Sequence, residues 1–562
     1  MGEVELMITG MTCSSCAQHV QSALEEVPGV RRARVPGWQS GRAFVTADEG
    51  LTTDELVAAV HAAGYRAAPV AGEGGLAPVA APPRRAPGHP TEREAAQRPD
   101  LLVIGGGSAG FAAAIRAAEL GQRATLVEAG TVGGTCVNVG CVPSKTLLAA
   151  MEGYEHAASN PFNGAPTTAG RLAWARLIDQ KNALVQQLRQ EKYLDVLAAY
   201  STIDLVLGSA RFEDAETVLV GDQTYCPGAV VIATGARPAI PPIPGLDEVP
   251  FIDSAAALDL REWPASLIVV GGGAIGLELG QLYARAGSAV TVIEMMPTLL
   301  PLEEAELSEA LASELQTCEG MRVETGARVE RVERAVHGVR VVFSRNGVES
   351  SVEGERLLVA TGRRPNVGGL NLEVAGVETD RRRAVVVNET LQTTNPRVFA
   401  AGDVTDVPQF VYVAAYAGGL AAANALTSEM TRFDLTALPR VTFTDPALAA
   451  VGLTEAQARE GGYPVMVTTL PLKFVPRALA THNTRGLIKL VADTTTRRLL
   501  GAHVLAATAG EVIQPAVLAI KFGLTVEQLI DSFFPYLTMV EGLKLALISF
   551  EKEVATLSCC AV

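Results

Sequence analysis

Residues 99–130 of the chain are PDLLVIGGGSAGFAAAIRAAELGQRATLVEAG. An apolar run leads into a glycine-rich turn, a helix of small apolar residues and a second apolar run, a pattern that predicts strand, turn, helix and strand. In the spacing Gly105-x-Gly107-x-x-Gly110, the first glycine permits the tight turn, the second admits a pyrophosphate, and the third allows close packing. Glu128 ends the second strand, where a carboxylate can accept ribose hydroxyls. The stretch therefore predicts a Rossmann-like dinucleotide-binding unit.

The same design returns in residues 265–296, ASLIVVGGGAIGLELGQLYARAGSAVTVIEMM. The second set of glycines and the acid that follows it are Gly271, Gly273, Gly276 and Glu294. An acid at this place repels a 2′-phosphate, and NADP sites usually carry Arg nearby. Because IEMMPTLL contains no Arg, the sequence favours NADH at this second cradle.

Length and charge restrict the class of protein. A chain of 562 residues predicts several domains, and the net charge of −15 argues against nucleic acid as a partner. We expect no membrane insertion and a cytoplasmic protein, because the sequence shows neither a long apolar run nor a signal-peptide pattern. Six of the eight cysteines form three close pairs, which indicates metal binding or redox chemistry rather than a disulfide scaffold.

One of these pairs follows the first nucleotide unit. GGTCVNVGCVPSK, residues 133–145, places Cys136 and Cys141 five residues apart, about one helical turn if a helix begins there. Gly133 and Gly134 would let the chain pass close to a flat ring system. The isolated Cys226 and Cys318 are expected to be buried, structural residues.

These motifs resemble those of the pyridine nucleotide–disulfide oxidoreductases, which include glutathione reductase and dihydrolipoyl dehydrogenase. The resemblance covers the chain from residue 99 to its end and includes VIATGARP (231–238), LLVATGRRPN (357–366) and VFAAGDV (398–404). It implies that the first cradle binds FAD and the second binds NADH or NADPH. It also implies a homodimer whose active site is shared across the interface.

The resemblance also implies roles for single residues. Lys145 would lie beside the flavin and pair with Glu278, Cys141 would face the flavin, and Cys136 would exchange with the substrate. The implied FAD site comprises Gly105, Gly107, Gly110, Glu128, Gly130, Thr135, Lys145, Ala210, Asp403 and Val411. The implied coenzyme site comprises Gly271, Gly273, Gly276 and Glu294.

One position departs from the disulfide-reducing members of this family. Those members carry a His-x-x-x-x-Glu pair that moves protons to and from thiols. Here FFPYLTMVEG keeps Glu541 but has Tyr536 at the His position. Tyrosine, with an ordinary pKa near 10, is a poor proton shuttle at neutral pH. His482 and His503 lie well upstream and are expected to be surface or core residues.

The chain ends in LSCCAV, with Cys559 and Cys560 adjacent. By itself this pair could be a surface pair, a prenylation motif without its basic residues, or a two-thiolate site for a soft ion. Together with Tyr536 and the redox pair, it resembles the mercury(II)-reducing branch of the family. That resemblance implies that the tail passes Hg(II) to Cys136 and Cys141 of the other subunit.

The N-terminal segment adds a third cysteine pair. GMTCSSCAQHV places Cys13 and Cys16 on the loop and first helical turn after the first strand. The positive end of a helix favours the thiolate form of such cysteines. With Tyr65 in AAGY, the segment resembles heavy-metal-associated domains, and we expect metal trafficking rather than redox chemistry. His19 is either a ligand or a residue of the helix face.

The predicted fold class is α/β. Two Rossmann-like domains and an α+β dimerisation domain follow a ferredoxin-like βαββαβ metal-binding domain. The predicted divisions are 1–69 for the metal-binding domain, 70–98 for a flexible linker, 99–250 with 371–440 for FAD, 251–370 for NAD(P), and 441–562 for dimerisation.

We expect reduction of Hg(II), delivered as small-thiol complexes, to Hg(0) in mercury detoxification. The alternatives are a dihydrolipoyl- or glutathione-type disulfide reductase and a mercury-sequestering binding protein.

Overall fold

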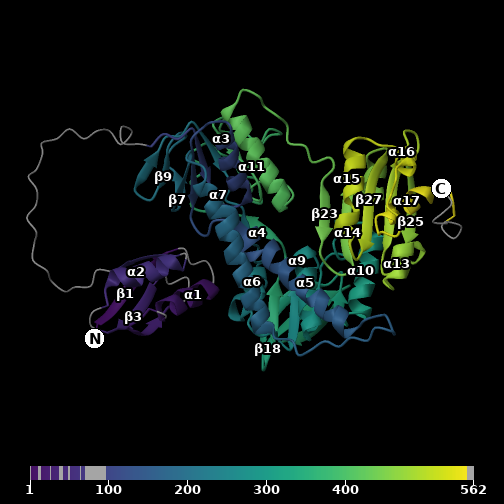
Figure 1. Cartoon of the computed structure of the whole chain (residues 1–562), viewed down its shortest axis with the longest axis horizontal. Helices are drawn as coiled ribbons and strands as arrows, with labels where there is room; N and C mark the ends of the chain where they lie inside the picture. The colour runs from purple at the N-terminus through teal and green to yellow at the C-terminus, as the bar shows by residue number, and fades with distance from the viewer. Residues whose placement is uncertain are drawn as a thin grey trace, which may run out of the picture. The chain divides into compact units, whose positions relative to one another are not determined.

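The computed structural model describes residues 2–9, 14–25, 27–36, 42–48, 51–63, 65–69 and 97–553 (Figure 1). Cys13, Cys559, Cys560 and most of the predicted linker lie outside the described residues. The chain forms two compact units. The first comprises Met1–Asn138, Val185–Arg237 and Arg364–Phe433, and the second comprises Val139–Leu184, Pro238–Arg363 and Asp434–Val562.

The N-terminal segment folds as a ferredoxin-like unit, as predicted. Its elements are β1 (Gly2–Thr9), α1 (Ser14–Glu25), β2 (Val30–Arg34), β3 (Arg42–Ala47), α2 (Thr53–Ala62) and β4 (Arg66–Pro69). The sheet is antiparallel in the order β2-β3-β1-β4. Its core contains Leu6 and Val45 from the sheet and Val20, Leu24 and Leu56 from the helices.

The first Rossmann-like sheet belongs to the first unit. Its strands are β5 (Leu101–Ile104), β6 (Ala124–Glu128), β7 (Ile203–Leu207), β11 (Ala229–Ile232) and β22 (Val398–Ala400). They are parallel in the order β22-β11-β5-β6-β7. Helices α3 (Ser108–Glu119) and α11 (Val411–Leu426) pack together in its core (Figure 1). A Cβ at Gly418 would lie 1.9 Å from the Ala109 carbonyl oxygen, so this packing requires glycine.

The remaining elements of this part of the chain are mostly short. They are α4 (Gly134–Val139), α6 (Trp174–Arg189), the π-helical turn η2 (Gln190–Leu194), α7 (Asp195–Ala198), β8 (Ala210–Phe212), β9 (Val218–Val220) and β10 (Gln223–Tyr225). The chain crosses between the two units within α4, within α6, within β12 (Ala236–Pro238), within β21 (Arg363–Pro365) and between Phe433 and Asp434.

The second Rossmann-like sheet belongs to the second unit and is parallel in the order β13-β20-β14-β15-β16. Its strands are β13 (Phe251–Ile252), β14 (Ser266–Val270), β15 (Ala289–Ile293), β16 (Arg322–Glu324) and β20 (Arg356–Val359). The helices of this region are α5 (Cys141–Ala158), η3 (Leu246–Glu248), α8 (Ser254–Leu258), α9 (Ala274–Ala286) and α10 (Ala305–Thr317). An antiparallel sheet of β17 (Arg328–Ala335), β18 (Gly338–Arg345) and β19 (Val348–Gly354) completes it.

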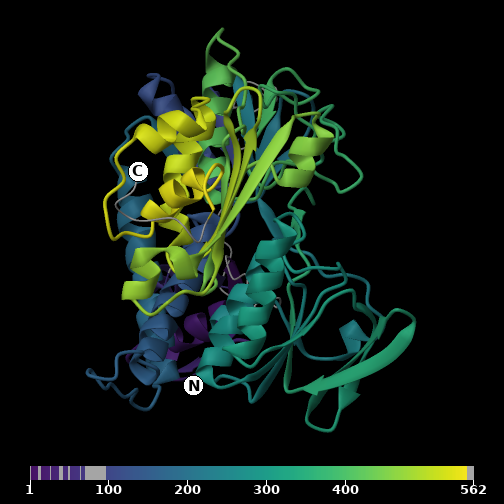
Figure 2. The same ribbon diagram turned by 90° about the vertical axis from the view of Figure 1, so that its right-hand side faces the viewer.

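The C-terminal part of the second unit is an antiparallel sheet in the order β23-β24-β27-β26-β25, with helices packed against it (Figure 2). The strands are β23 (Pro439–Thr442), β24 (Ala447–Gly452), β25 (Val465–Pro471), β26 (Leu487–Asp493) and β27 (Leu499–Ala506). The helices are α12 (Glu455–Glu460), η4 (Leu472–Phe474), α13 (Pro476–Ala480), α14 (Ala509–Val512), α15 (Gln514–Lys521), α16 (Val526–Asp531) and α17 (Glu541–Ile548).

A buried ion cluster joins α10 to this sheet. The Lys489 ammonium donates to Glu304 at 3.0 Å and to Glu306 at 2.8 Å, and lies 3.1 Å from the Glu455 carboxylate. The side chains of Lys489 and Glu304 are only 2% and 7% exposed. Beside them, the fully buried His503 places Nε2 3.1 Å from the Leu453 carbonyl oxygen.

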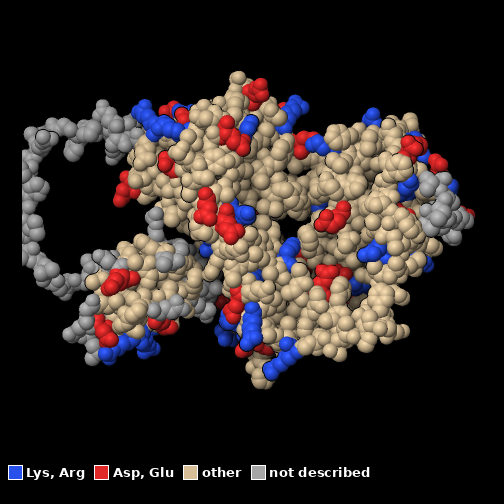
Figure 3. Space-filling view, in the orientation of Figure 1, with Lys and Arg blue, Asp and Glu red and all other residues tan. Residues whose placement is uncertain are grey.

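The surface carries both signs of charge. On the face shown in Figure 3, basic and acidic side chains are interspersed. No helix in the described part of the chain combines the length and the apolar character that a membrane crossing requires.

Candidate functional site

The first glycine-rich turn has the shape that its sequence predicts. Gly105 has φ +111°, and a Cβ there would lie 2.4 Å from the Ala233 carbonyl oxygen. A Cβ at Gly110 would lie 1.8 Å from the Gly105 carbonyl oxygen. Gly107 precedes α3, whose N-terminus receives no side-chain cap from the described residues. Uncapped N–H groups at the start of a helix are what a pyrophosphate needs, so this cradle fits FAD.

The carboxylate of Glu128 closes this turn. One oxygen accepts a hydrogen bond from Gly106 N at 2.6 Å and the other from Gly130 N at 2.6 Å. Burial raises the pKa of Glu128, and the hydrogen bonds from Gly130 and Gly106 oppose the increase. Glu128 therefore lies at the glycine loop, where the sequence predicts a ribose-binding acid.

The second cradle reproduces the first. Cβ atoms at Gly271 and Gly276 would lie 2.4 Å from the Ala360 and 2.0 Å from the Gly271 carbonyl oxygens, whereas one at Gly273 would meet no described atom within 4 Å. Glu294 accepts hydrogen bonds from Gly272 N at 2.6 Å and Met296 N at 2.7 Å. Open space before α9 and a carboxylate at the loop fit a nicotinamide dinucleotide.

The two redox cysteines lie on separate helices, so they are not related by one continuous helical turn, which their spacing alone allowed. Cys136 lies in α4, Gly140 interrupts the helix, and Cys141 is the first residue of α5. Both thiols are half-buried. Cys136 belongs to the first unit and Cys141 to the second. The start of the 18-residue helix α5 is a place where the helix dipole favours a thiolate.

The loop before Cys136 packs against the first cradle. Gly133 and Gly134 have φ values of +98° and +62°. A Cβ at Gly134 would lie 2.6 Å from the Gly107 Cα, which leaves no room for another residue type. The glycines therefore bring the segment that carries Cys136 against the nucleotide loop.

Lys145 and Glu278 form the pair that the sequence predicts. Lys145 Nζ donates to Glu278 Oε2 at 2.6 Å, and the Glu278 side chain is 7% exposed. The Phe443 N–H donates to the other Glu278 oxygen at 2.9 Å, and the Lys145 ammonium lies 4.6 Å from the Phe443 ring centroid. Sequence reasoning did not identify Phe443, because its contacts with the pair span more than 160 residues.

Tyr193 is a second residue that sequence reasoning missed. It lies in the π-helical turn η2, and π-turns occur often at functional sites. Its ring packs against Phe111 with centroids 4.8 Å apart and lies 3.6 Å from a Cβ built on Gly133. An aromatic side chain therefore borders the loop before Cys136. A π-turn has no sequence signal that distinguishes it from an ordinary helix.

Tyr536 and Glu541 lie at the C-terminal end of the second unit. The Tyr536 side chain is 62% exposed, whereas Glu541 is buried and begins α17. Glu541 accepts a hydrogen bond from Leu537 N at 3.2 Å. Phe533, three residues before Tyr536, is also fully exposed.

The other predicted FAD residues lie at element ends in the first unit. Thr135 lies in α4, Ala210 begins β8, Asp403 follows β22 and Val411 begins α11. Gly130, which follows β6, donates its N–H to the Glu128 carboxylate.

Two predictions about the isolated cysteines are wrong. Cys226 is only half-buried, and Cys318 is exposed, with its sulfur 3.3 Å from the Glu314 carboxylate. Cys318 directly follows α10 and is exposed, so it is not part of the buried core. The expectation for the upstream histidines is confirmed, since His482 is exposed and His503 is buried.

At the N-terminus, Cys16 lies in the first turn of α1. His19 Nδ1 lies 3.4 Å from the Tyr65 hydroxyl, and the two rings meet edge to face. His19 and Tyr65 therefore contact each other across the ferredoxin-like unit.

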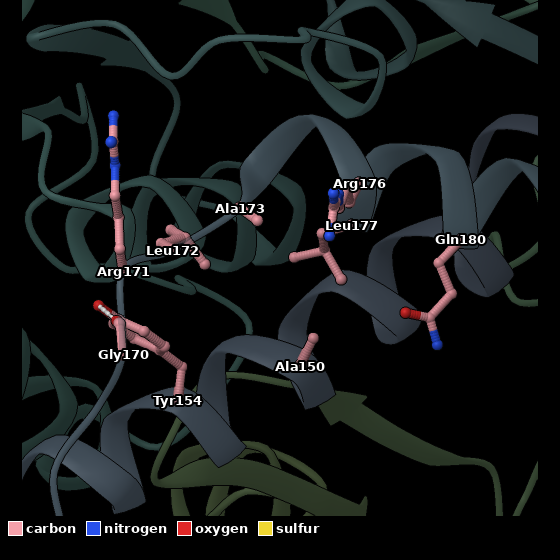
Figure 4. A pocket seen from close by; sticks show the side chains of 9 residues that line it. All are labelled: Ala150, Tyr154, Gly170, Arg171, Leu172, Ala173, Arg176, Leu177 and Gln180. Carbon is pink, nitrogen blue, oxygen red and sulfur yellow. Dashed lines mark hydrogen bonds between the residues drawn. The ribbon is translucent and has the colours of Figure 1, made fainter.

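The second unit has a surface pocket away from these residues (Figure 4). It has a volume of about 360 Å³ and is lined by Ala150, Tyr154, Gly170, Arg171, Leu172, Ala173, Arg176, Leu177 and Gln180. The Tyr154 hydroxyl donates to the Gly170 carbonyl at 3.0 Å. The lining contains no cysteine, so the pocket is distinct from the redox pair.

Family models match nearly all of the described chain. A model for pyridine nucleotide-disulphide oxidoreductases matches residues 99–418, one for the dimerisation domain of that family matches 438–547, and one for heavy-metal-associated domains matches 5–66.

Curated relatives and solved structures agree with these matches. Mercuric reductases from Staphylococcus aureus and Lysinibacillus sphaericus are 45% and 44% identical, over 99% and 100% of both chains. The HOCl-induced flavoprotein disulfide reductase RclA from Escherichia coli has a TM-score of 0.72 and 32% identity, covering 80% of this chain and 99% of that one. LpdA from Mycobacterium tuberculosis has a TM-score of 0.71 and 27% identity, with coverage of 80% and 99%.

Proposed function

Because the chain belongs to the pyridine nucleotide-disulphide oxidoreductase family, we propose that it reduces Hg(II) to elemental mercury with NADH or NADPH. The balanced reaction consumes one NAD(P)H and one Hg(II) and yields NAD(P)⁺, a proton and Hg(0). Bound FAD would supply the two-electron link between the nicotinamide and the site. In both cradles the first and third glycines leave no room for a Cβ, and this close packing supports both cofactors.

The residues around the redox pair have complementary roles in this proposal. Thiolates of Cys136 and Cys141 hold Hg(II), since soft metals prefer thiolate ligands. Lys145 provides a positive charge that Glu278 and the Phe443 ring hold in place. Tyr536, Cys559 and Cys560 would come from the partner subunit of a homodimer, which the dimerisation-domain match supports.

The proposal also includes a route by which Hg(II) reaches the redox pair. Cys13 and Cys16 bind Hg(II) received from small-thiol complexes, and the tether raises the local concentration at the core. The heavy-metal-associated match supports this role. Since reduced nicotinamides and small thiols are intracellular metabolites, we place the reaction in the cytoplasm.

The presence of Tyr536 at the histidine position is the main reason for proposing Hg(II) rather than a disulfide as the substrate. The chain has the cradles, the cysteine pair and the Lys145–Glu278 pair of a disulfide reductase, yet a tyrosine stands where thiol exchange needs a histidine. A metal dithiolate needs no such acid, because electrons alone release Hg(0).

The deciding experiment measures NAD(P)H oxidation with excess small thiol, with Hg(II), lipoamide or oxidised glutathione as the acceptor. Turnover with Hg(II) alone supports the proposal. Turnover with a disulfide instead identifies a disulfide reductase, and mercury binding without turnover identifies a sequestering protein.

Removing residues 1–96 should leave a folded core that retains FAD and at least about half of the activity with Hg(II) and excess thiol. Gln97 should remain because its N–H donates to the Thr224 carbonyl at 2.9 Å and its carbonyl accepts from Cys226 N at 2.9 Å. The flavin absorbance per chain and the rate provide the measurement. Loss of FAD on truncation would show that the metal-binding domain is part of the core fold.

NADH should support turnover at least as well as NADPH. The Glu294 carboxylate at the second cradle would meet a 2′-phosphate as a like charge, a repulsion that costs roughly a few kcal/mol, or one decade or more in affinity. The measurement is kcat/KM for both coenzymes at saturating Hg(II) and low ionic strength, for the wild type and for Glu294→Arg.

The ratio of the two kcat/KM values is the informative quantity, and the variant should shift it toward NADPH. A tenfold preference of the wild type for NADPH would contradict the prediction and would indicate that a basic side chain, such as Arg363 or Arg364, reaches the phosphate.

A further inference from the structure

Asn138 lies between the two redox cysteines in the sequence, and both the nitrogen and the oxygen of its side-chain amide form hydrogen bonds. Its Nδ2 donates to the Gly134 carbonyl at 2.8 Å and to the Val132 carbonyl at 3.1 Å. Its Oδ1 accepts from Arg189 Nε at 2.8 Å. The first two bonds fix the loop before Cys136, and the third ties that loop to a distant helix.

Arg189 is the last residue of α6, directly before the π-helical turn η2. That turn carries Tyr193, whose ring packs on Phe111 and borders Gly133. Arg189 therefore connects the segment that holds Cys136 with the segment that holds Tyr193. The two segments are more than 50 residues apart, and Asn138 bridges them.

We propose that Arg189 and Asn138 are positioning residues that hold Cys136, Tyr193 and the nucleotide loop in one fixed arrangement. The proposal deepens the mercury reductase function and rests on it for the substrate. The nucleotide loop is included because Gly134, the acceptor of one Asn138 bond, packs directly on Gly107.

The physical reason is geometric. A soft ion held by two thiolates requires both sulfurs at bonding distance, and Cys136 and Cys141 lie on separate helices. α4, with only six residues, has little stability of its own. An external clamp must therefore fix the position of Cys136, and a displacement of about 1 Å at a reacting atom can cost as much as 100-fold.

The first arm of the test measures the Hg(II) affinity of the reduced full-length protein by competition with a dithiol. Asn138→Ala and Arg189→Gln should each weaken binding at the redox pair about 10- to 100-fold. These measurements are made with the four other paired cysteines, Cys13, Cys16, Cys559 and Cys560, replaced by Ser. Arg176→Gln is the matched control, because Arg176 lies on the same helix and is exposed.

The second arm does not depend on mercury. The rate of Cys136 alkylation by iodoacetamide is followed against pH by mass spectrometry, with Cys141 as the internal reference. Both clamp variants should change the Cys136 profile and leave the Cys141 profile unchanged. Flavin content reports whether each variant folds.

Two conservative variants separate a clamp from general packing. Arg189→Lys keeps a donor for Asn138 Oδ1 and should recover part of the affinity. Asn138→Asp keeps the acceptor for Arg189 but loses both donors to the loop, so it should remain defective. Wild-type alkylation and affinity in both Asn138→Ala and Arg189→Gln would overturn the proposal. A wild type that binds mercury at this pair but does not reduce it would refute the function and leave the clamp standing.

Discussion

Replacing Cys136 or Cys141 with serine should lower Hg(II)-dependent NAD(P)H oxidation by about 1,000-fold or more. A serine hydroxyl is not ionised at neutral pH and is a hard ligand, so it replaces neither the thiolate nor its affinity for Hg(II). Removal of a residue that participates in the chemistry typically costs at least this factor. The measurement is the steady-state rate with excess small thiol.

The flavin provides the internal control for this result. FAD should remain bound in both variants, because the glycine cradle and Glu128 are untouched. Cys318→Ser should have the wild-type rate, since Cys318 is exposed after α10. Normal turnover by either redox-pair variant would refute the proposed mechanism.

Replacing Lys489 with methionine should lower the free energy of unfolding by about 3–5 kcal/mol. Such losses are typical when one partner of a buried ion pair is removed, because the other charge remains buried without compensation. Here the stranded charge is Glu304, whose side chain is 7% exposed, and two further carboxylates lie around the same ammonium. Urea titration of the FAD-loaded protein, followed by flavin and tryptophan fluorescence, measures the change.

Two variants test whether the loss arises from the buried charge. Lys489→Met with Glu304→Gln should recover part of the stability, since the buried negative charge is gone. Lys552→Met, at an exposed position after α17, should be close to the wild type. Equal stability of Lys489→Met and the wild type would mean that water solvates Glu304.

The cluster should also make unfolding depend on pH. Burial disfavours the ionised form of Glu306, but the hydrogen bond from Lys489 holds its pKa below the ordinary 4.5. Hydrogen bonds from Arg459 and Lys489 lower the pKa of Glu455 in the same way. A carboxylate with a lowered folded-state pKa contributes stability above its unfolded pKa and loses it as the pH falls. Below about pH 4.5, the wild type should therefore lose stability more steeply than Lys489→Met.

Sequence reasoning succeeded where the constraint is local. Gly110 and Gly276 are required by contacts within their own turns, and Gly105 and Gly271 have positive φ values, so the glycine spacing identifies both cradles. The ferredoxin-like βαββαβ order of the N-terminal segment is also predicted locally, because the spacing of apolar residues in each stretch distinguishes strands from helices. The Lys145–Glu278 pair was found through resemblance rather than physics, because 133 residues separate the two side chains.

The missed features depend on contacts between distant segments. Nothing in CVNVGC distinguishes one helix from two, and Gly140 ends α4 only in the folded context. Lys489 lies in β26, and nothing in the sequence of that strand marks it as an ion-pair residue. Its partners Glu304 and Glu306, at the start of α10, are more than 180 residues away. Tyr193 and Phe443 were missed for the same reason, since their importance lies in what the fold places beside them.

The two backbone hydrogen bonds that Glu294 accepts affect how coenzyme choice can evolve in this protein. The carboxylate that would repel a 2′-phosphate also closes its own loop, through Gly272 and Met296. A single mutation toward NADPH therefore opens the loop at the same moment that it removes the repulsion. A lineage that changes coenzyme must first acquire, or gain together, a second residue that restores the loop. Because two changes are needed together, the choice of coenzyme should change rarely in evolution. Where it has changed, related sequences should differ both at position 294 and at the second residue.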